Sequence, residues 1–415
     1  TFSDVERQFY EIRYTTFIEG QNERNAKIRH TERNRSIPDL LSSRKTCPEE
    51  TIYQLGTLDE HASAEDLLNI VTEFIEEFKA KFGNHVHVLD WALHLDESTP
   101  HIHERHVFDC ENKYGEVAPQ QEKALEALGF DLPDPAKSLS RRNNRKITFD
   151  AACREMLFEI AKRHGLPLVV DATFATPYLL RPFEHGADIV VHSLTKWLGG
   201  HGTALGGIVV DGGTFDWTDS RFSLYVEPDA SYHYLRWGYD LPEGYPPFIT
   251  RMRLVPMRNL GACISPDNAW MILQGLETLP LRMERHCANA LKVAYHLKQH
   301  PKVAWVRYPG LPDDPAHAAA CRMLRNGFGG MVVFGIQGGQ PAGQRFIEKL
   351  GLFSHLANVG DAKSLALHPA STSHAQLSEE QQRDAGLPPE LIRLSIGIEH
   401  IDDILEDLDQ ALGEI

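Results

Sequence analysis

The chain has 415 residues, of which 42% are hydrophobic and 24% charged, with a net charge of −16. This length suggests two domains or one large one, and the acidic balance argues against nucleic-acid binding by bulk charge. No apolar run is long enough to cross a bilayer, and the N-terminus lacks a signal-peptide pattern. The six cysteines have no paired spacing, so we expect reduced thiols and a cytoplasmic protein.

Residues 1–165 predict an α+β segment. A polar, charged opening stretch is followed by a predicted helix at about 63–82, which begins with a capping-box pattern at Ser63 and Asp66 and stops at Gly83. Strand-like runs follow at 85–95 and 101–108. Residues 131–147 are rich in proline and basic side chains, which predicts a loop, and a helix is expected at about 149–163.

Residues 166–415 alternate short apolar runs with helical patterns. Strands are expected at 167–174, 187–193, 206–213, 331–336 and 392–398, and helices at 265–279 and about 401–412. Ser265 and Pro266 suit the N-cap and first position of the earlier helix. The pattern predicts an α/β domain with a largely parallel sheet over 166–290, followed by a smaller α+β domain over 291–415.

The segment "HSLTKWLGGHGT" at 192–203 places Lys196 just after a predicted buried strand. Asp171 ends the preceding strand, and ligands bind at the carboxyl ends of strands in α/β sheets. A lysine, an acid and the hydroxyls of Ser193 and Thr195 suit pyridoxal phosphate, which needs a Schiff-base lysine, an acid for its ring nitrogen and donors for its phosphate. On spacing alone, an ordinary loop lysine and a helix-capping aspartate remain an equal alternative.

A longer resemblance favours the cofactor. "VVDATFATPYLLRPFEHGADIVVHSLTKWLGGHGTALGGIVVDGG", "NVGDAKSLALHPASTSH" and "IRLSIGIEHIDDILEDL" strongly resemble the Cys/Met-metabolism family of pyridoxal-phosphate enzymes, over about 166–415. "EPDASYHYLRWGY" is closer to O-acetylhomoserine sulfhydrylases than to cystathionine γ-synthases or γ-lyases. One local departure is Ala172, where the family usually has Asn.

The resemblance implies the C-terminal part of a fold type I (aspartate-aminotransferase-like) enzyme. It implies γ-replacement on O-acetylhomoserine with sulfide or a thiol, in the transsulfuration chemistry of methionine and cysteine biosynthesis, by a homo-oligomer. The implied roles are Lys196 as Schiff-base lysine, Asp171 as partner of the ring nitrogen, Thr173 beside the ring, Ser193 and Thr195 at the phosphate, and Ser364 and Arg393 at the substrate carboxylate. A planar guanidinium matches a carboxylate well.

The family's Gly-rich phosphate turn, ring-stacking aromatic and neighbour-subunit arm have no counterpart in residues 1–165. We therefore expect weak cofactor binding and impaired turnover.

A different resemblance covers the first half. "HLDESTPHIH" at 94–103 resembles the metal motif of MobV/Pre-type plasmid mobilisation relaxases. It implies a divalent ion, manganese or zinc, held by His94, His101 and His103 with help from Asp96 or Glu97, and acting on DNA. "RHTER" at 29–33 resembles the motif whose histidine attacks DNA, which makes His30 the candidate. The alternative of plain polar strand residues stays open, above all for His30.

The two resemblances meet near residues 160–167, where "EIAKRHGL" suits both families. We therefore interpret the chain as a fusion. Three hypotheses follow: a pyridoxal-phosphate sulfhydrylase, a relaxase fragment with a passenger, or a chain with two incomplete sites.

Overall fold

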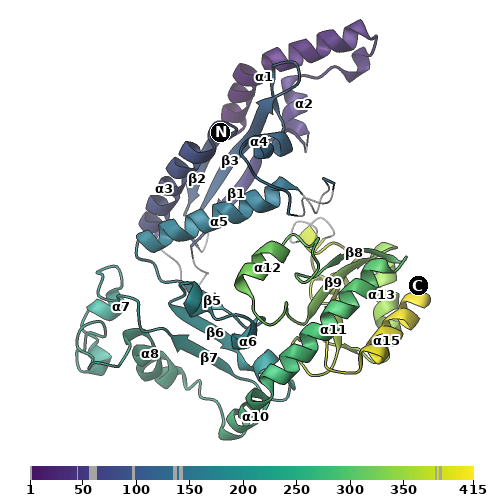
Figure 1. Ribbon diagram of the computed structural model, residues 1–415. Helices are drawn as coiled ribbons and strands as arrows, with labels where there is room; N and C mark the ends of the chain where they lie inside the picture. Colours follow the sequence, from purple (N-terminus) through teal and green to yellow (C-terminus); the bar gives the residue numbers. More distant parts are fainter. Residues whose placement is uncertain are drawn as a thin grey trace. The chain divides into compact units, whose positions relative to one another are not determined.

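The computed structural model describes residues 2–43, 45–55, 63–95, 99–133, 138–139, 144–378, 381–382 and 386–415. The chain divides into two compact units, an N-terminal unit of Thr1–Leu166 and a C-terminal unit of Pro167–Ile415 (Figure 1). All six cysteines lie within the described ranges and are free thiols. No helix in those ranges is long and apolar enough to span a membrane.

The N-terminal unit is built on an antiparallel sheet in the order β1–β3–β2. Its strands are β1 (Glu49–Tyr53), β2 (Val86–His94) and β3 (His101–Glu111), and β4 (Val117–Pro119) pairs with the end of β3. Helices α3 (Ala64–Phe82) and α5 (Arg145–Arg163) share one apolar core with this sheet. The short helix α4 (Gln121–Ala127) adds two buried residues to the same core.

The predicted start and stop of α3 are confirmed. Ser63 caps the helix by accepting a hydrogen bond from the backbone N–H of Asp66, and Gly83 follows its last residue. Helix α5 begins at Arg145, four residues before the predicted start, and so takes over the end of the predicted loop.

Helix α1 (Phe2–Lys27) occupies the opening stretch, for which no helix was predicted. Tyr10, Tyr14 and Ile18 lie one turn apart on its buried face. Asp109 of β3 holds the helix to the sheet, because its carboxylate accepts hydrogen bonds from Arg13 and from the Tyr14 hydroxyl. A short turn η1 (Thr31–Arg33) and helix α2 (Ile37–Ser42) follow.

The C-terminal unit begins with a three-stranded sheet in the order β5–β6–β7, formed by Val169–Asp171, Ile189–Ser193 and Gly207–Asp211. β5 and β6 are parallel, but β6 and β7 are antiparallel, so the prediction of a largely parallel sheet holds for one pair only. β5 is an edge strand, and Val169 on it is 53% exposed. An edge strand with exposed apolar side chains has free backbone groups with which another strand can pair.

Short helical segments surround this sheet. They are α6 (Thr176–Leu179), η2 (Pro182–His185), α7 (Ser223–Val226), η4 (Ala230–Tyr232), α8 (Pro247–Met252), η5 (Arg253–Met257) and α9 (Arg258–Leu260). Trp217, Tyr225 and Trp237 form the centre of a small aromatic core with Ile189 of β6. Helix α10 (Pro266–Glu277) begins as predicted, with Ser265 accepting from the Asn268 N–H.

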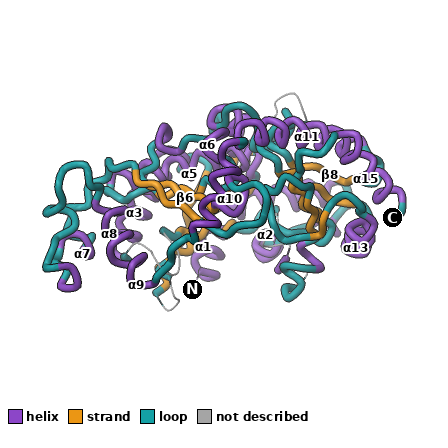
Figure 2. The backbone as a smooth tube through the Cα atoms, turned by 90° about the horizontal axis from the view of Figure 1, so that it is seen from below, coloured by secondary structure: helices purple, strands orange, loops and turns teal. Residues whose placement is uncertain are grey.

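The second sheet has the order β10–β11–β12–β9–β8. Its strands are Ser354–His355, Leu365–Leu367, Leu391–Ser395, Met331–Ile336 and Val303–Arg307 in that order. Helices α11 (Leu279–Gln299), α13 (Gly339–Lys349) and α15 (Ile401–Gly413) pack on one face (Figures 1 and 2). Alternate residues of β9 and β12 join that core, so Arg393 lies on the opposite face. The remaining elements are α12 (His317–Met323) and the turn η6 (Pro369–Ser371).

Candidate active site and candidate metal centre

Lys196 lies in a helical turn, η3 (Leu194–Leu198), that directly follows β6. Its backbone leaves helical geometry, with φ −87° and ψ −131°, while the side chains of Trp197 and Leu198 are buried. Lys196 is half-buried, and its side-chain nitrogen donates a hydrogen bond to the Asn358 side-chain oxygen. The turn therefore presents the amine beside a loop 162 residues further along the chain.

The ends of the two parallel strands are joined by side-chain hydrogen bonds. The Asp171 carboxylate accepts from the Thr173 N–H at 2.9 Å, and the Thr173 hydroxyl accepts from the Ser193 N–H at 2.8 Å. The Thr195 hydroxyl accepts from the Gly206 N–H at 3.1 Å. These four predicted residues thus lie together at the carboxyl ends of β5 and β6, with Asp171 exposed.

Arg393 approaches Lys196 through Asn358. The Arg393 guanidinium donates to the Asn358 backbone carbonyl at 3.3 Å, while the Asn358 side chain accepts from Lys196. Burial lowers the pKa of Arg393 from its usual value. A half-buried guanidinium bonded to a neutral carbonyl is suited to receive a carboxylate, because burial strengthens charge-assisted pairing.

The loop that carries Asn358 fits against the Lys196 turn only because Gly360 has no side chain. Gly360 has φ +78°, and a Cβ there would lie 2.5 Å from the Trp197 backbone nitrogen. The Gly360 N–H donates to the Ser395 hydroxyl on β12, and the Ala362 N–H donates to the Gly200 carbonyl. The loop thus connects the turn of Lys196 with the strand of Arg393.

Ser364, predicted to contact the substrate carboxylate, is fully buried. Its hydroxyl donates to Glu399 at 3.0 Å and accepts from the Gly397 N–H at 2.9 Å. These bonds hold the chain after β12, and the predicted role of Ser364 remains a prediction. The residue that contacts both Lys196 and Arg393 is Asn358, which the sequence analysis did not name. Asn358 belongs to the segment "NVGDAKSL", but no local feature of that segment indicates this contact.

Arg282 of α11 is a second residue that the sequence analysis missed. It is 5% exposed and donates to the carbonyls of Trp197, Leu198 and Gly275 at 2.8, 3.2 and 2.6 Å. Two of these carbonyls directly follow Lys196, so the guanidinium fixes the backbone of the lysine turn. The helical spacing of Leu279, Arg282, Met283 and His286 on one buried face was the available signal.

The three histidines of the candidate metal centre come together on one face of the N-terminal sheet. His94 pairs directly with His101 across β2 and β3, and His103 follows on the same face. A β-bulge between Val88 and Asp90 adds one residue to β2, which gives His94 this register. One nitrogen of each ring lies within 4.8 Å of the others, close enough to hold a single divalent ion. Asp96 and Glu97 lie outside the described residues.

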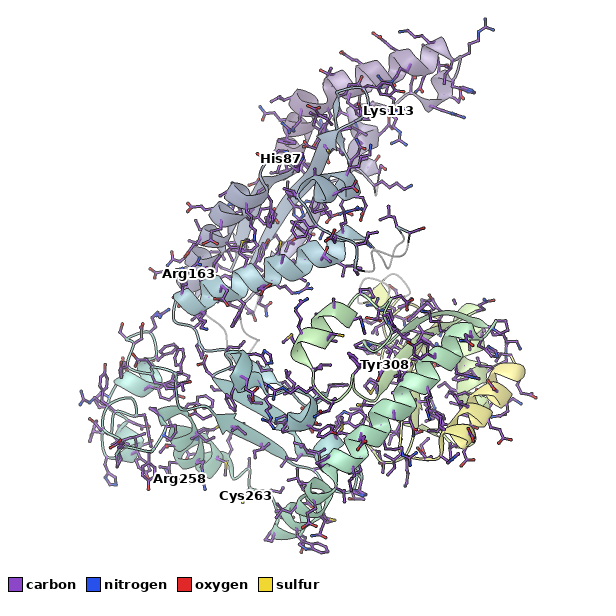
Figure 3. The ribbon with its side chains drawn as sticks, in the orientation of Figure 1. His87, Lys113, Arg163, Arg258, Cys263 and Tyr308 are labelled. Atoms are coloured by element: carbon purple, nitrogen blue, oxygen red, sulfur yellow. The ribbon has the colours of Figure 1, made fainter. Side chains whose placement is uncertain are left out.

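His30 is not brought to this cluster. The Glu6 carboxylate of α1 contacts Arg105 near the start of β3, and Arg24 pairs with Glu116 beyond the end of that strand. Helix α1 extends about 30 Å from Glu6 to Lys27, at 1.5 Å per residue. His30 follows this helix and therefore lies near the end of β3 that is away from the histidine cluster. Figure 3 labels Lys113 in the turn at that end. There, the exposed His30 ring bonds to Glu32 at 2.7 Å.

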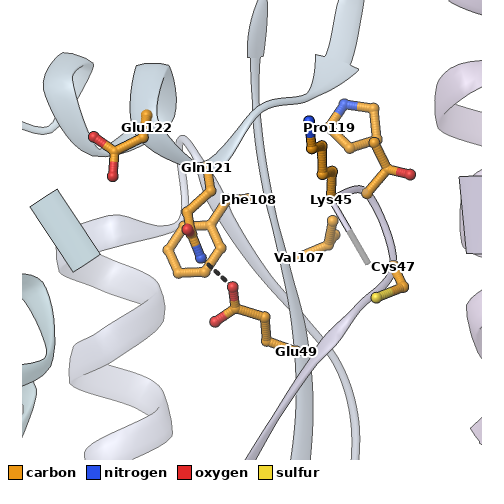
Figure 4. A pocket seen from close by; sticks show the side chains of 9 residues that line it. Lys45, Cys47, Glu49, Val107, Phe108, Pro119, Gln121 and Glu122 are labelled. Atoms are coloured by element: carbon orange, nitrogen blue, oxygen red, sulfur yellow. Dashed lines mark hydrogen bonds between the residues drawn. The ribbon is translucent and has the colours of Figure 1, made fainter. Parts of the chain in front are cut away.

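A pocket of about 300 Å³ lies elsewhere in the N-terminal unit (Figure 4). Its lining includes Lys45, Cys47, Glu49 and Phe108, and Glu49 is hydrogen-bonded there by Gln121. None of the three clustered histidines lines it.

Comparisons with known proteins cover the C-terminal unit and the last part of the N-terminal unit. The family model of Cys/Met metabolism PLP-dependent enzymes matches residues 149–413. An O-acetyl-L-homoserine sulfhydrylase of Leptospira meyeri is 54% identical over 66% of this chain and 63% of its own. A homocysteine synthase of Schizosaccharomyces pombe is 48% identical over 62% of this chain and 60% of its own. The chain thus spans about three fifths of the length of these relatives.

A crystal structure of a putative O-acetylhomoserine (thiol)-lyase from Campylobacter jejuni, with N'-pyridoxyl-lysine-5'-monophosphate, is also similar. It aligns with a TM-score of 0.58 and 43% identity, over 61% of each chain. This likeness identifies the C-terminal unit as an α/β fold of the pyridoxal-phosphate fold type I class.

Proposed function

The chain belongs to the Cys/Met metabolism family of PLP-dependent enzymes, and from this premise we propose that its C-terminal unit is built for γ-replacement on O-acetylhomoserine. The overall reaction joins sulfide to the substrate's γ-carbon and releases acetate, which gives homocysteine. The observation that carries the proposal is the convergence of Lys196, Asn358 and Arg393 next to the strand ends that hold Asp171 and Ser193.

The donor set fits pyridoxal phosphate in its chemistry. It contains a half-buried lysine amine, a carboxylate at a neighbouring strand end, and the hydroxyls of Ser193 and Thr195. When bound, the cofactor would link covalently to a lysine and take up the electrons released as bonds to the substrate's α-carbon break. Asp171 is the group that would keep the ring nitrogen protonated, and Thr173 is tied to Asp171 beside it.

The proton transfers are assigned to the Lys196 amine. A base must remove one proton from the substrate's α-carbon and one from its β-carbon, and after sulfide adds it must return a proton to each. The hydrogen bond to Asn358 holds the amine toward the side where Arg393 would bind the α-carboxylate. Fixing the carboxylate and the base on one side orients the α-carbon proton toward the amine.

We further propose that turnover is low, in a cytoplasmic homo-oligomer. β5 is an edge strand, and Asp171 at its end is exposed to water. Each charge-assisted hydrogen bond lost to a phosphate weakens binding by roughly 1.5–3 kcal/mol. The family's Gly-rich phosphate turn and neighbour-subunit arm have no counterpart in the sequence of residues 1–165, so we expect two or three such bonds to be missing. Their loss would reduce cofactor affinity by several orders of magnitude, since about 1.4 kcal/mol is tenfold.

A steady-state assay with O-acetylhomoserine and sulfide tests this proposal. The purified 415-residue chain with added cofactor should form homocysteine slowly, and Lys196→Ala should form none. Robust turnover at low cofactor concentration would contradict the impairment. Equal rates from the chain and from Lys196→Ala would contradict the assignment of the base.

A second candidate function concerns the N-terminal unit, and the clustered histidines support it. Three imidazoles on adjacent strands can bind zinc or manganese, which polarises a phosphodiester. We propose metal-dependent cleavage of a DNA strand, with the two units joined by fusion near residues 160–167. The separation of His30 from the cluster leaves its role as nucleophile a prediction.

Nicking of supercoiled plasmid tests the second candidate. The full chain should convert supercoiled DNA to the open circle when manganese is present, and His101→Ala should not. Ser364→Ala in the other unit is the matched control and should nick normally. Nicking that survives in His101→Ala, or that needs no metal, would contradict this function.

A further inference from the structure

We infer that Glu50 of β1 is a positioning residue that orients His103 for metal binding; the inference rests on the proposed metal centre. The His103 Nδ1 lies 2.8 Å from the Glu50 carboxylate. In the pairing of β1 with β3, Glu50 lies opposite Arg105 and Ile52 lies opposite His103. Glu50 and Ile52 are two residues apart, so their side chains are on the same face of the sheet. Glu50 and His103 are therefore diagonal neighbours on one face of the sheet.

The carboxylate selects one form of the ring. A carboxylate can only accept, so the bond requires a proton on Nδ1 of His103, and in the neutral ring the lone pair is then on Nε2. His101 is fixed in the same way, because its Nδ1 lies 2.9 Å from the Thr99 backbone carbonyl. Both rings thus present Nε2 as the ligand nitrogen. A second group that holds the other ring nitrogen of a metal-binding histidine is a general feature of such sites.

Glu50 is itself held in place. Arg105 lies 3.9 Å from the second Glu50 oxygen, and its guanidinium also donates to Glu6 of α1 at 2.8 Å. The positive charge of Arg105 keeps one carboxylate oxygen away from the histidines and leaves the other on His103. In this arrangement Glu50 orients a metal ligand and does not itself bind the metal. This agrees with a ligand cluster that consists of the three histidines.

Metal titration of the full chain tests the inference. Binding of Co²⁺ and Zn²⁺ is measured by calorimetry and by the Co²⁺ absorbance for wild type, Glu50→Ala, Glu50→Gln and the triple alanine variant of the histidines. Groups of this kind contribute about 10–100-fold to metal affinity. We expect a loss of that size in Glu50→Ala and a smaller loss in Glu50→Gln, whose amide oxygen can still accept from Nδ1. Glu76→Ala, which removes an exposed charge from α3, should bind like wild type.

The absorbance of the cobalt-saturated variants distinguishes positioning from direct ligation. An unchanged band shape in Glu50→Gln supports a positioning role, and a changed shape would show Glu50 to be a ligand and overturn it. Equal affinities in wild type and Glu50→Ala would overturn the role of Glu50 alone. A wild-type chain that takes up no metal, or binds it no better than the triple variant, would overturn the metal centre and Glu50 together.

Discussion

Replacing Arg282 by methionine removes a side chain that holds the backbone directly after Lys196. The guanidinium donates to the carbonyls of Trp197, Leu198 and Gly275 and to the Thr278 hydroxyl, all in a buried setting. Gly275 keeps a second donor, because its carbonyl also accepts from the Thr278 N–H. Methionine fills much of the volume but leaves the carbonyls of Trp197 and Leu198 without this donor.

Each buried polar group that loses its partner costs roughly 1–3 kcal/mol. Two such carbonyls give an expected loss of about 2–6 kcal/mol in the free energy of unfolding of the C-terminal unit. Arg282→Lys restores a charge but not the fork that reaches several carbonyls, so an intermediate loss is expected. The same variants should weaken uptake of pyridoxal phosphate, because the lysine turn loses its support.

Urea unfolding followed by tryptophan fluorescence measures this loss. Five of the six tryptophans belong to the C-terminal unit, and Trp91 is the exception, so the signal reports mainly that unit. The midpoint should fall while the slope with urea stays unchanged. A change of less than about 0.5 kcal/mol in Arg282→Met, the range of ordinary surface substitutions, would refute the reasoning.

Two further predictions concern the same unit. Gly360→Ala should destabilise the unit and move Asn358 away from Lys196, because the added Cβ would meet the Trp197 backbone. Gly244→Ala is the control, because Gly244 also has a positive φ but has open space around it. Equal urea midpoints for the two variants would contradict the clash. Burial lowers the pKa of His286 to about 4 from 6.5, so the unfolded chain takes up the proton first. The stability that this histidine contributes is complete above pH 6.5 and falls by about 3 kcal/mol as the pH drops to 4. His286→Gln should flatten this acid limb of a urea-midpoint profile, and an unchanged limb would contradict the assignment.

Sequence patterns predicted the local structure where one stretch carries both periodicity and caps. Helix α3 begins at its Ser63 cap and α10 at Ser265, because both signals depend on a few neighbouring residues. Helix α1 was missed because its buried Tyr10 and Tyr14 are separated by charged residues and contact a sheet formed far along the chain. Tertiary contacts of this kind override a weak local pattern.

The candidate sites show the same limit. The sequence could predict that Asp171 and Lys196 lie at the ends of neighbouring strands, because each follows an apolar run and the two runs pair in parallel. The pairing of Lys196 with Asn358 could not be predicted, because it depends on how two distant loops pack around Gly360. The bulge that brings His94 opposite His101 likewise has no signature in the motif itself.

Reduction of the cofactor-loaded chain with borohydride, followed by peptide mapping, tests whether Lys196 holds the cofactor. We predict a single pyridoxyl label on the peptide that contains Lys196, and no label in Lys196→Ala. A label on another lysine, or the same labelling in Lys196→Ala, would contradict the assignment of Lys196 as the residue that holds the cofactor.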